Sequence, residues 1–298
     1  MKTSRLILTC ILLTFVAALP AMAGPRTFVS GLGNDANPGT REQPKRTFAS
    51  ALTVTDPHGE VVVLDPAGFG SSTLTINKSV SIIVPAGIFG GVRVTSGPGI
   101  IVAAGASDTV VLRGLTLNSG GSGSSGIVFE SGSALHVENC IIFGFTSGSG
   151  IHVPLRHVGA LLYVIDTICR RNNVGVFSNA GRASLDHVRL EQNVYGLFVS
   201  GSETRGSIAN SVASGNAYGL EGDGGELNIE GCLVANNVGS GITSATGATV
   251  RISNSTVTNN GTGLHNYNST GTLLSRGNNT VQGNTTNKSG AIGSFAAD

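Results

Sequence analysis

Apolar and polar residues repeat along most of the chain with a period of 21 to 25 residues. Each repeat opens on a glycine that an aliphatic residue follows at once, and the glycines are Gly126, Gly150, Gly175, Gly196, Gly219, Gly241 and Gly263. A second aliphatic position recurs as Val137, Val164, Leu185, Ile208, Ile229, Ile252 and Leu274, and a third, five residues later, as Ile142, Cys169, Leu190, Ala213, Val234 and Val257. Stacked strands need such columns, because each side chain lies over its counterpart about 4.8 Å away. We predict that the columns form the interior of a β-solenoid of about eight to ten coils.

An asparagine recurs a few residues before the glycine of most repeats. The series is Asn172, Asn193, Asn216, Asn237 and Asn260. Asparagine tolerates the left-handed turn conformation, and its amide can donate to and accept from the same group in the neighbouring coils. The series therefore predicts an asparagine ladder at a turn, a feature that specifies the fold and not a chemistry.

The repeats and the segment that precedes them resemble a known family, the secreted right-handed parallel β-helix repeat proteins related in fold to the pectate lyases. Residues 27–52, TFVSGLGNDANPGTREQPKRTFASAL, are similar to the capping segment of that family. The resemblance implies an all-β fold, a single-stranded right-handed parallel β-helix with a short N-terminal capping helix. Phe48, Ala51 and Leu52 would cover the open end, since an uncovered coil exposes its core and its strand edges. We expect a strand and helix cap over 24–58 and the β-helix over 59–298.

The first 23 residues have the features of a signal peptide. Lys2 and Arg5 precede an apolar stretch, and Ala21-Met22-Ala23 supplies a small-residue cleavage site. We expect cleavage after about Ala23 and a secreted or periplasmic location.

Composition and charge narrow the classes of partner. The chain has 44 Gly in 298 residues, no Trp and 12% charged residues, which favours many short strands joined by tight turns. Without the signal segment, two of the 18 basic residues are lost and none of the 17 acidic ones, so the net charge is 16 − 17 = −1. This charge does not favour a nucleic-acid partner. The next most apolar stretch, 99–117, contains Asp108 and Arg113, so we expect no membrane span.

Cysteine and acidic residues give no sign of a metal or a cofactor. The expected mature chain holds Cys140, Cys169 and Cys232, an odd number that does not suggest a disulfide framework, and we expect buried free thiols. The segment EGDGGE, residues 221–226, contains three acids but lacks a repeated glycine-rich nonapeptide, so a turn is the better interpretation.

One outward column carries candidate binding residues. Two positions after the glycines stand His152, Phe177, Phe198 and Glu221, and Asp223 follows on the same face. The two Phe rings would form an aromatic platform for the apolar faces of sugars, and paired carboxylates can serve glycoside hydrolysis at the right separation. The alternative is that the stacked rings only stabilise the sheet surface.

A second candidate is basic and comprises Arg170, Arg171 and His187. Such groups could act as base and charge neutraliser in the β-elimination of uronates, a lyase chemistry that the resemblance implies. The alternatives are structural: Arg170 shares a column with Glu191 and could form a cross-strand ion pair, and His187 shares a turn column with Asp166.

A third outward column is unusually apolar. It comprises Ile141, Ile168, Arg189, Val212, Leu233 and Thr256. A continuous apolar stripe on a solvent face indicates a covered surface, so homo-oligomers that associate through this strand face are one hypothesis. A shift of one residue in the facing assignment would instead turn the stripe inward.

These patterns leave two function classes. One is a carbohydrate-directed protein of the cell envelope or exterior that binds a polysaccharide on the Phe177/Phe198 face and, if it is an enzyme, cleaves it as a polysaccharide lyase or glycoside hydrolase. The other is a non-catalytic structural or adhesive surface protein. The small number of ionisable residues on the expected groove weakens the enzyme interpretation without excluding it.

Overall fold

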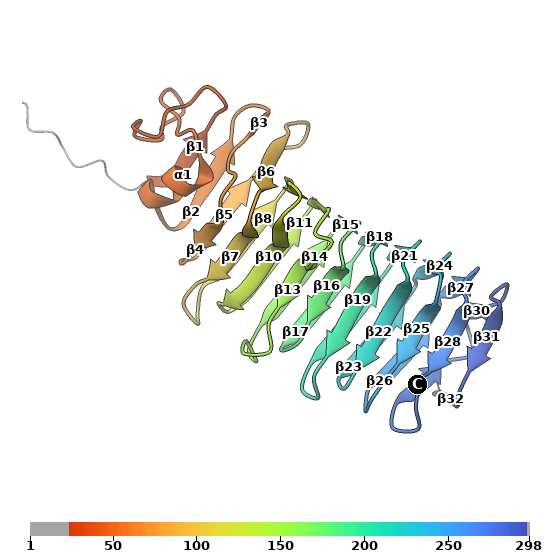
Figure 1. The fold of residues 1–298 in the computed structure, drawn as a ribbon. Coiled ribbons are helices and arrows are strands. Elements are labelled where there is room, and N and C mark those ends of the chain that lie inside the picture. Colours follow the sequence, from red (N-terminus) through yellow and green to blue (C-terminus); the bar gives the residue numbers. More distant parts are fainter. Residues whose placement is uncertain (1–23, 297–298) are drawn as a thin grey trace, which may run out of the picture.

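The computed structural model describes residues 24–296 as a parallel β-solenoid with three sheets (Figure 1). The expected signal peptide, residues 1–23, lies outside the described residues. Each coil contributes one strand to each sheet, so two ten-stranded sheets and one twelve-stranded sheet run along the molecule. This is the all-β fold predicted from the repeat, with about ten coils.

Sheet 1 has twelve strands. They are β1 (Gly24–Val29), β2 (Thr55–Val63), β5 (Val80–Ile83), β8 (Thr109–Arg113), β11 (Ala134–Glu138), β14 (Leu161–Ile165), β17 (Arg182–Asp186), β20 (Arg205–Ala209), β23 (Glu226–Glu230), β26 (Thr249–Ser253), β29 (Thr272–Ser275) and β32 (Ile292–Ser294).

Sheets 2 and 3 have ten strands each. Sheet 2 comprises β3 (Ala67–Gly68), β6 (Gly90–Val94), β9 (Leu115–Ser119), β12 (Ile141–Phe143), β15 (Ile168–Arg170), β18 (Arg189–Glu191), β21 (Val212–Ser214), β24 (Leu233–Ala235), β27 (Thr256–Thr258) and β30 (Thr280–Val281). Sheet 3 comprises β4 (Leu74–Ile76), β7 (Gly97–Ala103), β10 (Gly123–Ser131), β13 (Ser149–Val153), β16 (Val174–Ser178), β19 (Tyr195–Ser200), β22 (Tyr218–Asp223), β25 (Ser240–Ser244), β28 (Thr262–Asn266) and β31 (Thr286–Ser289).

The N-terminal end of the solenoid carries a short helix, α1 (Phe48–Val54), which packs on β1, β2 and β4 (Figure 1). The Thr47 side chain accepts a hydrogen bond from the Ser50 amide at 3.2 Å, and this contact begins the helix. Phe48, Ala51 and Leu52 are buried, and the Phe48 ring lies 5.1 Å from the Phe69 ring. The helix therefore covers the first coil with the residues that the sequence indicated.

The repeated apolar residues stack in register and form one core. In sheet 1, for example, Val137, Val164, Leu185, Ile208, Ile229 and Ile252 are consecutive strand partners, and all are buried. The assignment of Leu274 to this column is wrong. Leu274 pairs with Arg251 and is half-buried, whereas Leu273 pairs with Val250 and is buried. The preceding loop spans 267–271, one residue more than loop 245–248 of the previous coil, and a one-residue shift moves a side chain to the other face.

The asparagine ladder is present, and it is longer than expected. Each Nδ2 donates to the Oδ1 of the asparagine in the next coil, at 3.1 Å for Asn172 to Asn193 and 2.8 Å for Asn237 to Asn260, and Asn284 continues the series. The ladder residues do not adopt the left-handed conformation themselves. The residue before each of them does, with φ values of 54° at Arg171, 55° at Gln192, 66° at Gly215, 58° at Asn236 and 56° at Asn259.

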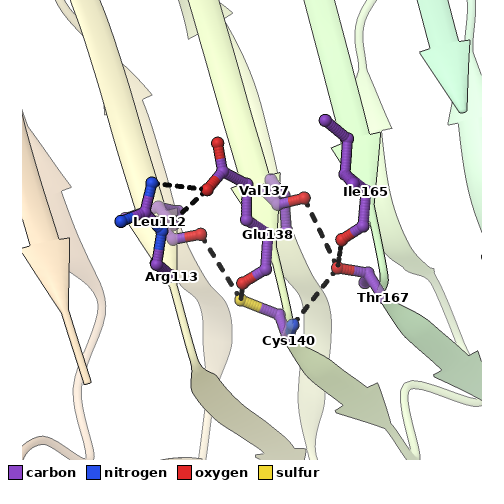
Figure 2. A network of polar contacts seen from close by, with 7 residues as sticks. All are labelled: Leu112, Arg113, Val137, Glu138, Cys140, Ile165 and Thr167. Atoms are coloured by element: carbon purple, nitrogen blue, oxygen red, sulfur yellow. Dashed lines mark hydrogen bonds and ion pairs between the residues drawn. The ribbon is translucent and has the colours of Figure 1, made fainter. Parts of the chain in front are cut away.

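The three cysteines within residues 24–296 are buried free thiols, as expected. Figure 2 shows how Cys140 closes the turn after β11: its amide donates to Thr167 Oγ1 at 3.2 Å, and its Sγ lies 3.5 Å from the Leu112 carbonyl oxygen. Thr167 replaces the thiol in the next coil and donates to the Ile165 carbonyl at 2.9 Å. Burial raises the pKa of the Cys140 thiol to about 12, so the group is a packing element and not a nucleophile.

Candidate functional site

The outward column of sheet 3 has the register that the repeat predicted. Consecutive strand partners along it are Val128, His152, Phe177, Phe198, Glu221, Thr243 and His265. Asp223 lies two residues beyond Glu221 on β22 and therefore on the same face of the sheet. The structure thus brings all five residues of the first candidate site onto one surface.

The rings of this column form a stack. His152 lies 5.0 Å from Phe177 with an interplanar angle of 5°, and Phe177 lies 5.1 Å from Phe198 with an angle of 9°. Both faces of Phe177 are therefore covered by neighbouring rings, which leaves its edge for solvent. His152 Nε2 is buried without a hydrogen-bond partner, and burial lowers the pKa of this imidazole. The geometry favours packing as the role of Phe177 over a flat platform for a sugar.

Two tyrosines extend the stack beyond Phe198. The Tyr195 ring lies 5.3 Å from Phe198 and 5.0 Å from Tyr218, which is its strand partner in the next coil. Tyr218 is 39% exposed. The aromatic surface therefore becomes exposed at Tyr218, whereas Phe177, Phe198 and Tyr195 are half-buried.

The tyrosines border a hollow of about 420 Å³, which we call the tyrosine hollow. Its lining comprises Tyr195, Tyr218, Glu221, Asp223, Ser240, Thr243, Ala245, Thr246, His265 and Tyr267. Ser240 Oγ and His265 Nδ1 lie 3.1 Å apart, and the His265 ring meets the Tyr267 ring edge to face at 5.5 Å. Rings therefore border the hollow on two sides, with hydroxyl groups and carboxylates between them.

Glu221 has the most distinctive electrostatics of the hollow. Burial raises the pKa of its carboxyl group to about 7, and the negative charge of Asp223 acts in the same direction. Near neutral pH the group is partly protonated, so it can donate a hydrogen bond or a proton as well as accept one. Hydroxyl groups, a partly protonated carboxyl and ring faces together match the mixed polar and apolar surface of a sugar.

The basic residues of the second candidate site lie apart. Arg171 and His187 occupy left-handed turns, with φ of 54° and 53°, of which the first follows β15 and the second precedes β18. Arg171 Nε donates to Gln192 Oε1 at 2.9 Å, and His187 Nδ1 lies 3.0 Å from the Asp186 carboxylate. The three-residue strands of sheet 2 separate these two turns.

Arg170 has its own neighbour. It pairs in register with Glu191, as the column predicted, but the Glu191 carboxylate is held by Arg189 at 2.5 Å. The Arg170 guanidinium instead lies over the Phe143 ring, 5.4 Å from its centroid. Each member of the basic cluster thus has a local structural partner.

The third column does face outward on sheet 2. Ile141, Ile168, Arg189, Val212, Leu233 and Thr256 are consecutive strand partners, and their side chains alternate with buried ones. Leu233 is 40% exposed, and Arg189 interrupts the apolar run. Two apolar pairs therefore lie on the surface, one on each side of a charged residue.

Residues 24–296 contain neither a cluster of metal-ligating side chains nor a membrane-spanning helix. No group of three or more His, Cys, Asp and Glu side chains in this range lies close enough to hold a metal ion. None of the helices formed by these residues is long and apolar enough to cross a membrane.

The sequence interpretation missed the part of the site that is most accessible. Tyr195, Tyr218, Ser240, His265 and Tyr267 were not assigned to the hollow. A signal existed for four of them. Tyr195 and Tyr218 stand directly before the repeat glycines Gly196 and Gly219 in adjacent coils, and His265 and Tyr267 stand two and four positions after Gly263, in the outward columns of Glu221 and Asp223.

The family of the chain follows from its coils. Residues 98–286 match the family described as the right-handed β-helix region. The chain belongs to this family. No curated protein sequence matches the chain.

Two solved structures are similar to the chain in fold. Pectate lyase Pel9A is similar with a TM-score of 0.66 and 18% sequence identity, over 93% of this chain and 79% of that one. The GH136 lacto-N-biosidase of Eubacterium ramulus has a TM-score of 0.49 and 10% identity, over 91% of this chain and 67% of that one. At these identities the likeness shows the fold alone.

Proposed function

We propose that this chain is an exported polysaccharide-binding protein that holds a neutral glycan in the tyrosine hollow of sheet 3. The observation that carries the proposal is the gathering of Tyr195, Tyr218, Glu221 and His265 around one accessible space of about 420 Å³. Pectate lyase Pel9A, a protein named for a polysaccharide, shares the fold, which is in keeping with a carbohydrate ligand.

The charge of the hollow argues for a neutral ligand. Glu221 and Asp223 are its two acids, and its lining contains no Arg or Lys. A uronate would place a third carboxylate beside these two, whereas the hydroxyl groups of a neutral sugar can donate to them. Ring faces at Tyr218 and Tyr267 would meet the apolar faces of the sugar rings.

We further propose that the chain cleaves the glycan that it binds. Glu221, with its raised pKa, is the candidate proton donor to a glycosidic oxygen, and Asp223 is the candidate carboxylate partner. Both side chains project from β22 on the same face of the sheet, two residues apart. Export rests on the N-terminal segment, residues 1–23, whose sequence has the features of a signal peptide.

The test is a binding screen of residues 24–298 against neutral polysaccharides (glucans, mannans, xylans and galactans) and acidic ones. Reducing ends would report hydrolysis, and ultraviolet absorbance would report unsaturated lyase products. Tyr218→Ala and Glu221→Gln should each weaken binding of the neutral ligand at least tenfold, while Tyr163→Ala, an aromatic change on sheet 1, should not. Failure of every neutral polysaccharide to bind, or equal binding by all variants, would refute the proposal.

A second function is favoured by the outward column of sheet 2. Ile141 and Ile168 are adjacent on the surface, as are Val212 and Leu233, and a second copy of the chain could cover them. In this case the protein is structural or adhesive. Light scattering over a range of concentrations should then show self-association that Leu233→Asp abolishes, with glycans having no effect. A chain that stays monomeric at high concentration would exclude this function.

A further inference from the structure

Two arginines lie side by side on sheet 1 without an acidic partner. Arg182 on β17 and Arg205 on β20 are direct strand partners, so their backbones are about 4.8 Å apart. Within residues 24–296 neither side chain forms an ion pair or a hydrogen bond. Glu226 is the strand partner of Arg205, but its carboxylate lies 3.5 Å from Arg251 Nη1. Like charges directly opposite one another are destabilising, so a bound anion would stabilise this arrangement.

The arginines border a hollow of about 340 Å³. The next outward column, two residues along the strands, supplies its floor with small side chains, Ser184 and Ser207, which are also strand partners. Asn228 follows them in the next coil. The floor thus offers hydroxyl and amide groups beside two guanidinium groups, and bulky side chains do not fill the space.

A tyrosine closes one end of this hollow with an open ring face. Tyr163 stacks on His136 at 4.7 Å with an interplanar angle of 17°, which covers one of its faces. On the other side its strand partner is Ser184, whose side chain is too short to cover the ring. In contrast to Phe177, which lies between two rings, Tyr163 ends an aromatic stack. A sugar ring could therefore take the place of the missing third ring.

We propose that this hollow, the arginine hollow, binds a sugar unit that carries a sulfate or phosphate ester. The sugar ring stacks on Tyr163 over Ser184, and the ester group lies between Arg182 and Arg205. A carboxylate has two oxygen atoms and one guanidinium fork satisfies them, whereas a sulfate or phosphate ester presents three terminal oxygens that two guanidinium groups can share. Two unpartnered arginines on adjacent strands fit the three-oxygen group better.

The inference is independent of the proposed function, because it concerns a different sheet and a ligand of different charge. The tyrosine hollow contains two acids and no basic side chain from Arg or Lys, whereas two arginines border the arginine hollow. Each site can therefore fail or succeed in its own test.

The experiment uses residues 24–298 and four dextran oligosaccharide preparations of matched length: unmodified, sulfated, phosphorylated and carboxymethylated. Calorimetry should show at least tenfold tighter binding of the sulfated or the phosphorylated oligosaccharide than of the carboxymethylated one, and the tighter of the two identifies the ester. Arg182→Gln and Arg205→Gln should each lose at least tenfold in this affinity, and Tyr163→Ser should weaken it. Arg93→Gln, on sheet 2, removes the same charge and should leave it unchanged.

Three results would overturn the inference: no binding of either ester, equal affinity for the carboxymethylated oligosaccharide, or unchanged affinity in either arginine variant. All three altered side chains lie on the surface of sheet 1 and none belongs to the core, so the variants should fold. Circular dichroism of each variant verifies this. A neutral glycan that binds normally to the arginine variants would show that the sheet 3 site is intact.

Discussion

At the scale of single residues, each turn between sheets 2 and 3 uses two consecutive residues for two different purposes: one turns the backbone and the next forms hydrogen bonds. The first residue takes the left-handed conformation, as Arg171 does with φ of 54°, and the second, Asn172, points its amide into the solenoid. Asn172 accepts from the Phe145 amide at 3.1 Å and donates to the Ile142 carbonyl at 3.3 Å. The buried amide thus satisfies backbone groups of the previous coil that have no water to bond to.

Replacement of a ladder asparagine should be costly. Asn172→Ala leaves the buried Phe145 N–H and Ile142 C=O without their partner, and we expect a loss of about 2–4 kcal/mol in unfolding free energy. Asn173→Ala is the matched control, since the next residue is less buried and its side chain forms no hydrogen bond within residues 24–296. Urea denaturation measures both. Similar losses in the two variants would contradict the ladder as a source of stability.

Glu221 should make stability depend on pH. Its folded-state pKa of about 7 is above the ordinary carboxyl value of 4.5, so folding favours the protonated form. The contribution of Glu221 to the free energy of unfolding is fully present below pH 4.5 and is lost as the pH rises through about 7. Melting temperatures of the wild type, Glu221→Gln and the loop variant Glu42→Gln should be compared from pH 4 to 8. The glutamine at 221 should reduce the decline, and the change at 42 should not.

At the scale of elements, the outer face of sheet 3 shows that an aromatic column on parallel strands stacks its rings instead of presenting them. The neighbours along the column are one strand spacing apart, about 4.8 Å, which is close to the separation of stacked rings. His152 and Phe198 therefore stack on the two faces of the Phe177 ring. A ring face is free only where the column ends or changes position, as at Tyr218 and Tyr163.

Phe177→Ala should accordingly affect stability and not binding. The loss of two ring contacts should cost about 1–3 kcal/mol, while affinity for a neutral glycan should change less than twofold. Phe89→Ala is the control for stability, because Phe89 is 50% exposed and stacks on no other ring within residues 24–296. If Phe177→Ala loses glycan binding but keeps normal stability, the result would instead support the aromatic binding platform that the sequence suggested.

At the scale of the whole molecule, the two ends of the solenoid differ. The N-terminal end carries α1, and β32 lies at the other end (Figure 1). The helix buries Phe48, Ala51 and Leu52, whereas β32 buries no side chain. Because a solenoid coil contacts only its neighbours, each end stabilises mainly the coil next to it. The N-terminal cap should therefore matter more than the last strand.

Deletion of residues 24–54 should lower the unfolding free energy by at least about 3 kcal/mol, since two large apolar side chains, Phe48 and Leu52, leave the core. It should also increase binding of a hydrophobic dye, because the first coil becomes exposed. Deletion of residues 290–298 should have a small effect on both quantities. Thermal unfolding with dye fluorescence measures both deletion variants, and equal effects would show that α1 is not a stabilising cap.

The sequence by itself determined the solenoid. A column that recurs once per coil must face inward on every strand if it does so on one, so the interior and the asparagine ladder could be predicted from spacing. The cap residues were predicted from the resemblance of residues 27–52 to the capping segment of the family. Even the outward facing of Phe177, Phe198 and Glu221 followed from alternation along a strand. The predicted facing was wrong at Leu274, where loop length changed, because one added residue reverses the side on which a strand residue lies. The left-handed conformation expected of the ladder asparagines belongs instead to the residue before each of them.

The tertiary structure decided which outward residues form a site. Ring faces are covered or free according to what lies one coil away, and a hollow exists where small side chains such as Ser184 and Ser207 adjoin large ones. The environment of Glu221, the pairing of Glu191 with Arg189 and the separation of Arg171 from His187 likewise depend on contacts between side chains. Periodicity specifies the register of the backbone. Which neighbouring side chains pair or stack with one another is decided by packing between the coils.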